Sequence, residues 1–281
     1  MLERRDFLKT LLGVVTLSLH RPDFERIITN EKKEIHASTD NTCTNIRRIR
    51  INPKYTFDTF VPGGSNRFAF SAAMTVANGG KKYNPLFISG GSGLGKTHLM
   101  HAIANKALEE IADIKMLYVT SEQFADDLVS AIRHGKTPEF KGHYRSASLL
   151  LIDDLHFIKN RPATQAELFH TFDALYESQK QIVMTSRMPP HQIKNITNAL
   201  RSRLGRGIVA HIQPCNSEPG FVQYITRKKA EATGIVIPDD IYSLIASKSH
   251  NVREIEGLLS QLDYRSRILG EPISLDAIGM I

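Results

Sequence analysis

Residues 85–99, PLFISGGSGLGKTHL, join a short apolar run to a glycine-rich turn and then to a helical pattern. Within this stretch, residues 90–97 follow the spacing Gly-x-x-x-x-Gly-Lys-Thr, which predicts a phosphate-binding loop between a strand and a helix. Its glycines let backbone N–H groups approach phosphate oxygens, and the helix N-terminus adds a positive dipole end. We expect Lys96 to reach the β- and γ-phosphates and the Thr97 hydroxyl to take one Mg²⁺ position. The residues predicted to contact the nucleotide here are Gly90, Gly91, Gly93, Gly95, Lys96, Thr97 and His98.

A second apolar run, SLLLIDD at residues 148–154, ends in two aspartates. Ligands of open α/β sheets bind at the carboxyl ends of the strands, so both carboxylates are expected beside the phosphate loop. Asp153 is the predicted Mg²⁺ ligand, through water, and Asp154 is placed to orient or polarise the attacking water. Capping of the next helix is the competing interpretation of the pair. Together the two motifs predict a site for ATP or ADP with Mg²⁺.

Apolar strand-like runs alternate with helical patterns around these motifs, which predicts an α/β fold with a parallel sheet. The predicted strands are 85–90, 115–120, 148–154, 181–186 and 208–213. The predicted helices between them are 97–110, 121–134, 137–145, 164–179 and 197–204. A small all-helical domain follows, in which Asn251 is the predicted N-cap of the last helix. Its predicted helices are 221–233, 238–248 and 251–268.

Three domains are predicted along the chain. They are a short N-terminal segment and linker over 1–50, a nucleotide-binding domain over 51–213 and a helical lid domain over 214–281.

The composition is that of a soluble globular protein, with 281 residues of which 41% are hydrophobic and 23% charged. The formal net charge of +7 favours a polyanionic partner, such as nucleic acid or an anionic membrane surface. Two cysteines, Cys43 and Cys215, lack disulfide or metal-ligand spacing, which indicates a reducing cytoplasm. No apolar run reaches the roughly 18 residues that a bilayer span requires.

The N-terminus pairs Arg4 and Arg5 with a short apolar run, a combination that also occurs in twin-arginine export signals. No small-x-small cleavage site follows it, and HRPDFER comes next instead. The favoured interpretation is an amphipathic helix over residues 6–15, followed by the strand VTLSL. Residues 21–50 are polar and lack periodicity, which predicts a linker.

Six blocks of the sequence carry a family resemblance. They are INPKYTFDTFVPGGSNR, YNPLFISGGSGLGKTHLMHAIA, LLLIDDLHFI, QAELFHTFDALYESQKQIV, ALRSRLGRG and NVREIEGLL. In content and order they resemble the bacterial chromosomal replication initiators of the DnaA family. The resemblance covers about residues 50–281 and implies an AAA+ P-loop NTPase fold with a helical lid.

The resemblance implies further site residues. Arg203 matches the family's arginine finger, which would reach the γ-phosphate of ATP on a neighbouring subunit, and a guanidinium fork suits that contact. With Lys96 and Asp154, it completes the predicted catalytic set. Arg253 matches the lid arginine called sensor 2, which would couple lid position to ATP or ADP. The segment FDTFVPGGSNR would line the adenine pocket, with Asn66 as the polar contact.

The family also inserts a helix pair, used to line up subunits and grip single-stranded DNA, which here corresponds to about residues 121–146. Its basic residues could track phosphates with salt-sensitive affinity, although a charged, solvated helix face explains them equally well. They are Arg133, Lys136, Lys141 and Arg145. The implied partners are single-stranded DNA and further subunits, with the replicative helicase, a full-length initiator and acidic membrane lipids as additional candidates.

Four features depart from the family's pattern. Arg187 in TSRMPP stands where an acidic residue is usual, and a positive charge near the γ-phosphate would bind ATP tightly or disturb hydrolysis. Ala199 replaces an arginine used in subunit contacts, and the family's LETR is missing near Glu218. The chain ends at SLDAIGMI, about where the family's helix-turn-helix domain would begin. The segment over residues 1–50 is shorter than the family's N-terminal domain. The stretch LERRDFLKTLLG would be a remnant of that domain.

The sequence thus predicts a DnaA-type initiator, or a truncated paralog, that binds ATP, assembles through a trans arginine finger and acts on origin DNA. Hydrolysis is expected to be slow and switch-like. A regulator of the Hda kind, a helicase-loader-like ATPase and a nucleotide-holding scaffold are the alternatives. Arg187 and Ala199 favour the scaffold, whereas the intact acidic pair and Arg203 favour hydrolysis.

Overall fold

A computed structural model describes residues 51–80, 83–218 and 220–273. The helix predicted over 6–15, the strand VTLSL, the linker and Cys43 lie outside the described residues. No helix in the described ranges is both long and apolar enough to cross a membrane.

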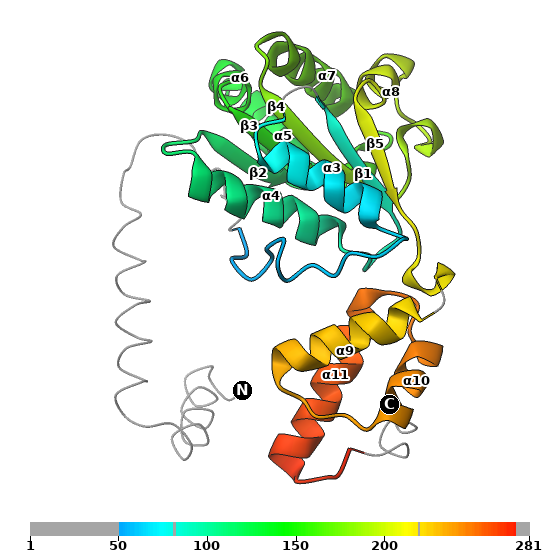
Figure 1. The fold of residues 1–281 in the computed structure, drawn as a ribbon. Helices are drawn as coiled ribbons and strands as arrows, with labels where there is room; N and C mark the ends of the chain where they lie inside the picture. The colour runs from blue at the N-terminus through cyan, green and yellow to red at the C-terminus, as the bar shows by residue number, and fades with distance from the viewer. Residues whose placement is uncertain (1–50, 81–82, 219, 274–281) are drawn as a thin grey trace, which may run out of the picture. The chain divides into compact units, whose positions relative to one another are not determined.

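A five-stranded sheet lies at the centre of the α/β part (Figure 1). Its strands are β1 (Leu86–Gly90), β2 (Met116–Thr120), β3 (Leu149–Asp153), β4 (Gln181–Ser186) and β5 (Ile208–Ile212). They lie in the order β2-β3-β4-β1-β5, and every neighbouring pair is parallel. The predicted parallel sheet is therefore confirmed. All carboxyl ends meet at one edge, where β4 separates the strand of the phosphate loop from the strand of the acidic pair.

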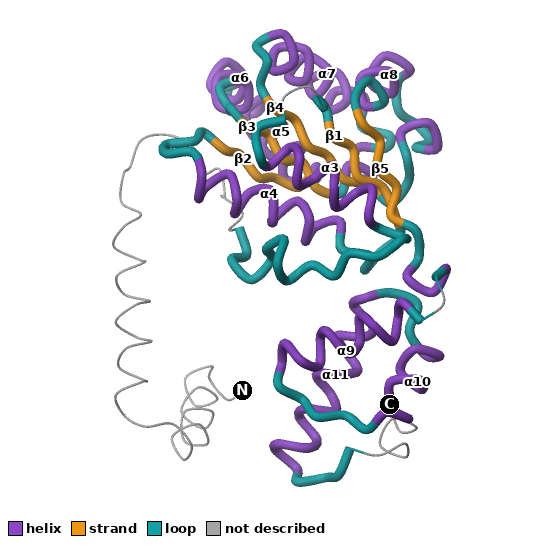
Figure 2. The backbone as a smooth tube through the Cα atoms, in the orientation of Figure 1, coloured by secondary structure: helices purple, strands orange, loops and turns teal. Residues whose placement is uncertain are grey.

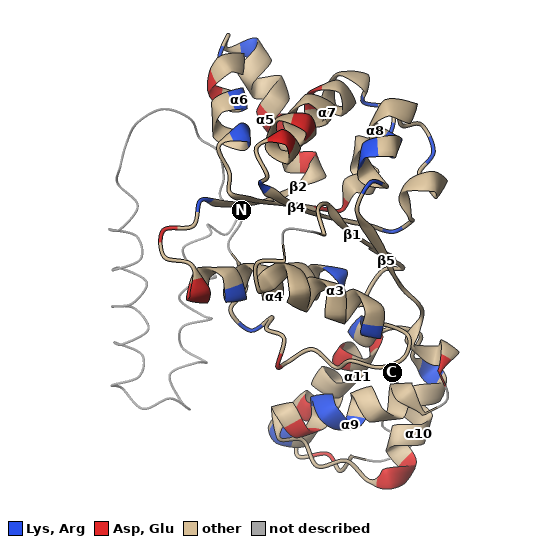
Figure 3. Cartoon of the chain, turned by 45° about the horizontal axis from the view of Figure 1, so that its top comes forward, with Lys and Arg blue, Asp and Glu red and all other residues tan. Residues whose placement is uncertain are grey.

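The strands are apolar because helices cover both faces of the sheet. β1 and β3 are buried along their whole length. Within the five described strands, Asp153 is the one residue with a formal charge. Figure 3 accordingly shows the basic and acidic residues coloured on the helices and connecting loops, with the strands almost entirely tan.

Two groups of helices form the covering layers (Figures 2 and 3). One layer consists of α3 (Arg67–Ala77) and α4 (Lys96–Glu110), which share a core with residues of β1, β3, β4 and β5. The other consists of α5 (Ser121–Arg133), α6 (Thr137–Arg145), α7 (Pro162–Glu177) and α8 (Asn198–Leu204). The phosphate loop opens α4, so the first layer brings the motif to the sheet edge.

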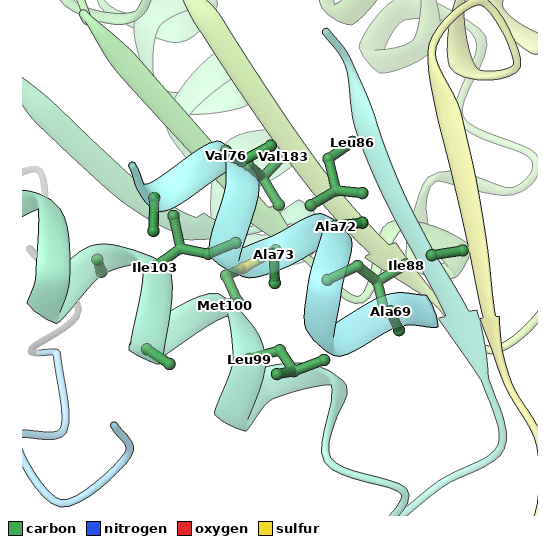
Figure 4. Packing of buried hydrophobic residues seen from close by; sticks show 14 of the residues in the cluster. Ala69, Ala72, Ala73, Val76, Leu86, Ile88, Leu99, Met100, Ile103 and Val183 are labelled. Carbon is green, nitrogen blue, oxygen red and sulfur yellow. The ribbon is translucent and has the colours of Figure 1, made fainter. Parts of the chain in front are cut away.

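Helix α3 was not among the predicted helices. Its buried side is lined by small residues, Ala69, Ala72 and Ala73, which lie against β1 and α4 in Figure 4. Its ends carry no side-chain cap, no acidic residue in the first turn and no basic residue in the last, so the local signals of a helix boundary are absent. The other predicted helices are present, with ends shifted by up to two residues on the α/β part.

The helical lid has a separate hydrophobic core formed by α9 (Phe221–Thr233), α10 (Asp239–Lys248) and α11 (Val252–Tyr264). The last helix ends at Tyr264 instead of residue 268, and a π-helical turn, Arg265–Leu269, follows it. The predicted N-cap is confirmed, because the Asn251 side chain accepts a hydrogen bond from Glu254 N–H at 3.1 Å. This cap places the start of α11 against the phosphate loop, as described below.

We predict that Gly207, between α8 and β5, cannot be replaced by alanine without a large loss of stability. A Cβ there would lie 2.1 Å from the Pro85 carbonyl oxygen, whereas a Cβ on Gly205 would meet nothing closer than 3.6 Å. We expect Gly207→Ala to lower the free energy of unfolding by about 2 to 3 kcal/mol, since backbone atoms must shift. The matched control Gly205→Ala should change it by less than about 1 kcal/mol. Urea unfolding followed by circular dichroism measures both, and equal changes would contradict the packing described.

Candidate nucleotide site

The phosphate loop connects β1 to α4 through glycines with unusual backbone angles. Gly93 and Gly95 have φ of 72° and 93°, a left-handed conformation that a side chain would strain. A Cβ on Gly93 would also lie 2.4 Å from the side-chain oxygen of Asn251. The Gly93 carbonyl accepts a hydrogen bond from Val252 N–H at 3.1 Å. The absence of a side chain at Gly93 therefore lets the start of α11 touch the loop.

Lys96 is a buried cation at the first position of α4. It is 7% exposed, and its Nζ donates to the Gly91 carbonyl at 2.7 Å. Burial lowers the pKa of Lys96, the two aspartates after β3 oppose this shift, and the charges of Arg187 and Arg253 lower it further. An ammonium group that is desolvated and crowded by guanidinium groups is stabilised by an anionic ligand. Phosphate oxygens have the required charge.

Asp153, at the end of β3, is buried and surrounded by hydrogen-bond donors. Its Oδ2 accepts from the Thr97 hydroxyl at 2.8 Å and from the Tyr118 hydroxyl at 3.0 Å. Its Oδ1 accepts from the Thr185 hydroxyl and from Asp154 N–H at 3.0 Å. Burial and the adjacent Asp153 charge raise the pKa of Tyr118, so its phenol keeps the proton that it donates. The sequence-predicted pair of Thr97 and Asp153 is thus in direct contact.

Thr97 and Asp153 fit a Mg²⁺ ion. They offer a hydroxyl and a carboxylate, both hard oxygen donors, whose oxygens are 2.8 Å apart. The described ranges contain no group of three or more His, Cys, Asp or Glu side chains that could hold a metal. Mg²⁺ commonly takes one or two protein oxygens and completes its shell with phosphates and water. The pair therefore suits a metal that arrives with a nucleotide.

Asp154 has a different environment from Asp153. Its backbone is left-handed, with φ 53° and ψ 48°, and its side chain is 41% exposed. The His156 ring, which is cationic only when protonated, lies close to it, with its Nδ1 3.7 Å from Asp154 Oδ1. Burial lowers the pKa of His156, which favours the neutral ring, so the ring is not a charged partner of the Asp154 carboxylate. Such a carboxylate at the sheet edge can accept a proton or orient water.

The loop, Asp154 and the start of α11 line a cavity of about 220 Å³. Lys96, Arg187 and Arg253 all line it, together with the carboxylates of Asp154 and Glu256. Arg253 is tethered weakly, with its Nη1 3.5 Å from the Ser92 hydroxyl. Arg187 makes no hydrogen bond or ion pair with another described residue. Three cationic side chains thus face one small cavity, which is the electrostatic environment of a polyphosphate site.

Asn66 and His98 lie on the side where the base is expected. Asn66 lines a second cavity of about 30 Å³ and is 6% exposed. Its Oδ1 accepts from Gly63 N–H at 2.8 Å, and its Nδ2 donates to the Val61 carbonyl at 3.0 Å. The amide therefore holds its own loop in shape, and its contact with a base stays a prediction. His98 lines both cavities and stacks on Tyr55 at 4.7 Å.

Arg203 lies on α8 and does not line the cavity of the phosphate loop. Its Nε donates to Asp173 Oδ1 at 2.6 Å, and its guanidinium lies 5.3 Å from the Phe169 ring centroid. Both partners belong to α7. The Arg203 Nη2 also donates to Asp173 Oδ2 at 3.4 Å, so among the described residues Nη1 is the nitrogen left for another acceptor. Ala199 is exposed on the same helix.

The basic residues predicted to track DNA fall into two groups. Lys141 and Arg145 on α6 both reach Glu167 of α7, at 3.8 Å and 2.8 Å. Glu167 is 9% exposed, and its contacts join α6 to α7. Two of the four basic side chains predicted to bind DNA are therefore paired within the protein. Lys136 pairs with Glu139 at 3.7 Å, and Arg133 is exposed at the end of α5.

Two contacts of Asp153 were not predicted, those with Tyr118 and Thr185. Each residue lies inside an apolar strand, where tyrosine and threonine are common for packing reasons alone. No local pattern in the sequence signals these two contacts, because they depend on the strand order. β3 lies between β2 and β4, so hydroxyls near the carboxyl ends of both neighbours can reach the carboxylate that ends β3.

The parallel sheet with this strand order, the phosphate loop, the acidic pair and the attached helical lid define an AAA+ P-loop NTPase fold. The family model described as the bacterial DnaA ATPase domain matches residues 51–211. The chain belongs to this family.

The chromosomal replication initiator protein DnaA of Thermodesulfovibrio yellowstonii is 46% identical over 256 residues, which cover 90% of this chain and 56% of that protein. The same protein of Geobacter sulfurreducens is 44% identical over 265 residues, covering 93% of this chain and 59% of the relative. The chain thus spans little more than half the length of these curated relatives.

Solved structures agree with this assignment. Domain III of the Thermotoga maritima replication initiation protein DnaA superposes with a TM-score of 0.78 at 38% identity, covering 83% of this chain and 98% of that one. A replication initiator DnaA bound to AMPPCP and single-stranded DNA superposes with a TM-score of 0.73 at 32% identity, covering 79% and 68%. The Thermotoga maritima RuvB branch migration motor, at 18% identity and a TM-score of 0.58, shares the fold alone.

We predict that Arg187 contributes to the affinity for ATP more than to that for ADP. Arg187 follows β4 and lines the same cavity as Lys96 and Asp154. We expect the γ-phosphate to lie among these three side chains. Loss of a hydrogen bond to a charged group costs about 1.5–3 kcal/mol, so Arg187→Ala should weaken ATP binding at least tenfold and ADP binding by less than about threefold. Isothermal titration calorimetry measures both affinities.

The control for this prediction is Lys194→Ala. Lys194 is exposed, carries the same charge and lies outside the residues that line the cavity. Its removal should leave both affinities within about twofold, because exposed charges are screened. Equal losses of ATP and ADP affinity in Arg187→Ala would contradict a γ-phosphate contact.

Proposed function

We propose that this chain binds ATP with Mg²⁺ and acts as the ATPase module of a DnaA-type replication initiator at origin DNA. The observation that carries the proposal is the contact of the Thr97 hydroxyl with Asp153 beside a cavity lined by Lys96, Arg187 and Arg253. The relatives at 44–46% identity are replication initiators, and a solved relative is bound to AMPPCP and single-stranded DNA. Domain roles follow the predicted division into residues 1–50, 51–213 and 214–281.

The residues of the cavity have distinct roles in the proposed hydrolysis. Lys96 binds the β- and γ-phosphate oxygens, and the loop glycines place backbone N–H groups around them. Thr97 and Asp153 would hold Mg²⁺, which neutralises charge on the phosphates when bound. Asp154 orients the attacking water. Arg253 contacts the nucleotide from the lid, so the lid position differs between ATP and ADP.

Arg203 acts in trans in this proposal. It lies outside the cavity of its own subunit, and the Nη1 edge of its guanidinium is left for an acceptor while Asp173 holds Nε and Nη2. A neighbouring subunit would receive this edge at its γ-phosphate, where a positive charge stabilises the transition state. Hydrolysis is then slow in a single subunit and acts as a switch of assembly. The proposed compartment is the cytoplasm.

We predict that ATP turnover per subunit rises with protein concentration in the wild type and stays low in Arg203→Ala. Loss of an arginine finger typically costs 10³–10⁵ in turnover, so a fall of at least about a hundredfold is expected at high concentration. Phosphate release is measured across a concentration series, with and without single-stranded DNA.

Arg206→Ala is the matched control, because Arg206 is an exposed arginine near Arg203 whose guanidinium lies over the Tyr176 ring at 4.2 Å. It should keep the concentration dependence. A rate per subunit that is flat with concentration and unaffected by Arg203→Ala would refute the trans mechanism. Tight ATP binding without turnover in the wild type would favour the nucleotide-holding scaffold.

Single-stranded DNA is the proposed partner of the α5–α6 face. Arg133 is the proposed main contact, because Lys136, Lys141 and Arg145 each lie within 4 Å of a glutamate, Glu139 or Glu167. Self-assembly, a full-length initiator, the replicative helicase and acidic lipids are further proposed partners. The net charge of +7 is compatible with the two polyanionic partners, single-stranded DNA and acidic lipids.

We predict that Arg133→Ala weakens binding of single-stranded DNA more than Lys141→Ala does. An exposed guanidinium can release a phosphate counterion, so its loss should lower affinity about three- to tenfold and reduce the salt slope by about 0.7. The ammonium of Lys141 faces Glu167, and its removal should cost less than about twofold. Fluorescence anisotropy over a salt series with a labelled oligonucleotide tests this. A larger loss of affinity in Lys141→Ala than in Arg133→Ala would contradict the proposal that Arg133 is the stronger DNA contact.

A further inference from the structure

The Tyr118 hydroxyl is the donor to Asp153 that no proposed role accounts for. It lies 3.0 Å from Asp153 Oδ2, the same oxygen that accepts from Thr97 at 2.8 Å. Thr97 belongs to the proposed Mg²⁺ site and Thr185 binds the other oxygen, Oδ1. Tyr118 therefore restrains the metal-facing oxygen without being a metal ligand itself.

The position of Tyr118 is a consequence of the sheet. β2 pairs with β3 in parallel register, with Thr120 opposite Asp153 and Tyr118 opposite Leu151. A side chain two residues before the end of β2 must be long to reach the carboxylate that ends β3. A phenol has this length, and its ring has few rotamers to lose.

The ring of Tyr118 is itself held from behind. His101 of α4 meets it edge-on, with ring centroids 4.6 Å apart, and is 5% exposed. The Nδ1 of His101 accepts a hydrogen bond from Asn52 N–H at 2.8 Å. Asn105, one turn further along α4, donates to the carbonyls of Asn52 and Tyr55 at 2.9 Å each. The segment that enters the α/β part is thus fastened to the helix that supports Tyr118.

We propose that Tyr118 is a positioning residue for the Mg²⁺ site: it fixes the rotation of the Asp153 carboxylate, backed by His101 and the segment over residues 52–55. The inference rests on the proposed function, because it assumes that Asp153 serves Mg²⁺ with a nucleotide. Groups that orient a metal ligand from outside the coordination shell typically change metal affinity 10–100-fold. Tyr118 should therefore control the dependence on Mg²⁺ and leave metal-free nucleotide binding unchanged.

The test is a Mg²⁺ titration of the binding of an ATP analogue with a fluorescent ribose substituent. For Tyr118→Phe we expect the Mg²⁺ concentration at half-maximal effect to rise about tenfold, with the affinity in EDTA within about twofold of wild type. The variant keeps the ring that packs on His101 and loses the hydroxyl alone. Melting temperatures measured without nucleotide report its folding.

Tyr144→Phe is the matched control. Tyr144 is also a tyrosine whose hydroxyl donates to a carboxylate, Asp127 Oδ2 at 2.6 Å, but both residues belong to the α5–α6 pair and neither lines the cavity. It should leave the Mg²⁺ midpoint at the wild-type value. A second check combines Tyr118→Phe with Asp153→Asn, where loss of the hydroxyl should have no further effect on the midpoint.

Three outcomes would overturn the inference. One is a wild-type Mg²⁺ midpoint in Tyr118→Phe, and another is an equal loss of affinity with and without Mg²⁺, which indicates a general packing defect. In both cases the wild type still binds nucleotide with Mg²⁺, and the proposed function stands. The third is nucleotide binding by the wild type that does not depend on Mg²⁺, which would overturn the proposed Mg²⁺ site together with the inference.

Discussion

A buried carboxylate that no cation contacts directly among the described residues constrains the whole site. Asp153 is 3% exposed, and ionised oxygens at this depth are costly unless donors surround them. The donors come from four places: α4 supplies Thr97, β2 supplies Tyr118, β4 supplies Thr185, and the backbone after β3 supplies an N–H. Only the last of these donors adjoins Asp153 in the sequence, and the other three come from distant parts of the chain. The carboxylate is satisfied only when β3 lies between β2 and β4 and α4 packs on their face.

The same strand order determines which charges meet at the phosphate loop. Because β4 lies between β1 and β3, the residue that follows β4 emerges between the loop and the acidic pair. In this chain that residue is Arg187, and it faces a cavity already lined by Lys96 and Arg253. Arg253 arrives from the lid, which the left-handed Gly93 allows to approach the loop closely. The lining therefore holds three cationic side chains against two carboxylates, Asp154 and Glu256, and this excess of positive charge favours an anionic ligand.

Local motifs were predictable because a few adjacent residues specify them. The phosphate loop, the acidic pair, the strand positions and the Asn251 cap all depend on short-range backbone chemistry, and the structure shows them where the pattern placed them. Helix α3 was missed, and its ends carry neither a side-chain cap nor the first-turn acid and last-turn base that mark helix boundaries. The hydrogen bonds of Asn66 could not be predicted either. Only the folded loop shows that its amide accepts from Gly63 N–H and donates to the Val61 carbonyl.

Charge pairing across helices was equally hidden from the sequence. Lys141 and Arg145 look like DNA-tracking cations on an isolated helix, but they converge on a glutamate some 20 residues later. Arg203 likewise acquires Asp173 as a partner through the packing of α8 on α7. The sequence by itself determined the parallel α/β fold, the phosphate loop and the aspartate that ends β3, because apolar periodicity and glycine spacing act over a few residues. Only the tertiary structure decided which donors hold Asp153, which cations face the cavity and which basic side chains stay unpaired. Those contacts join residues that strand order and helix packing bring together, and no local pattern encodes that order.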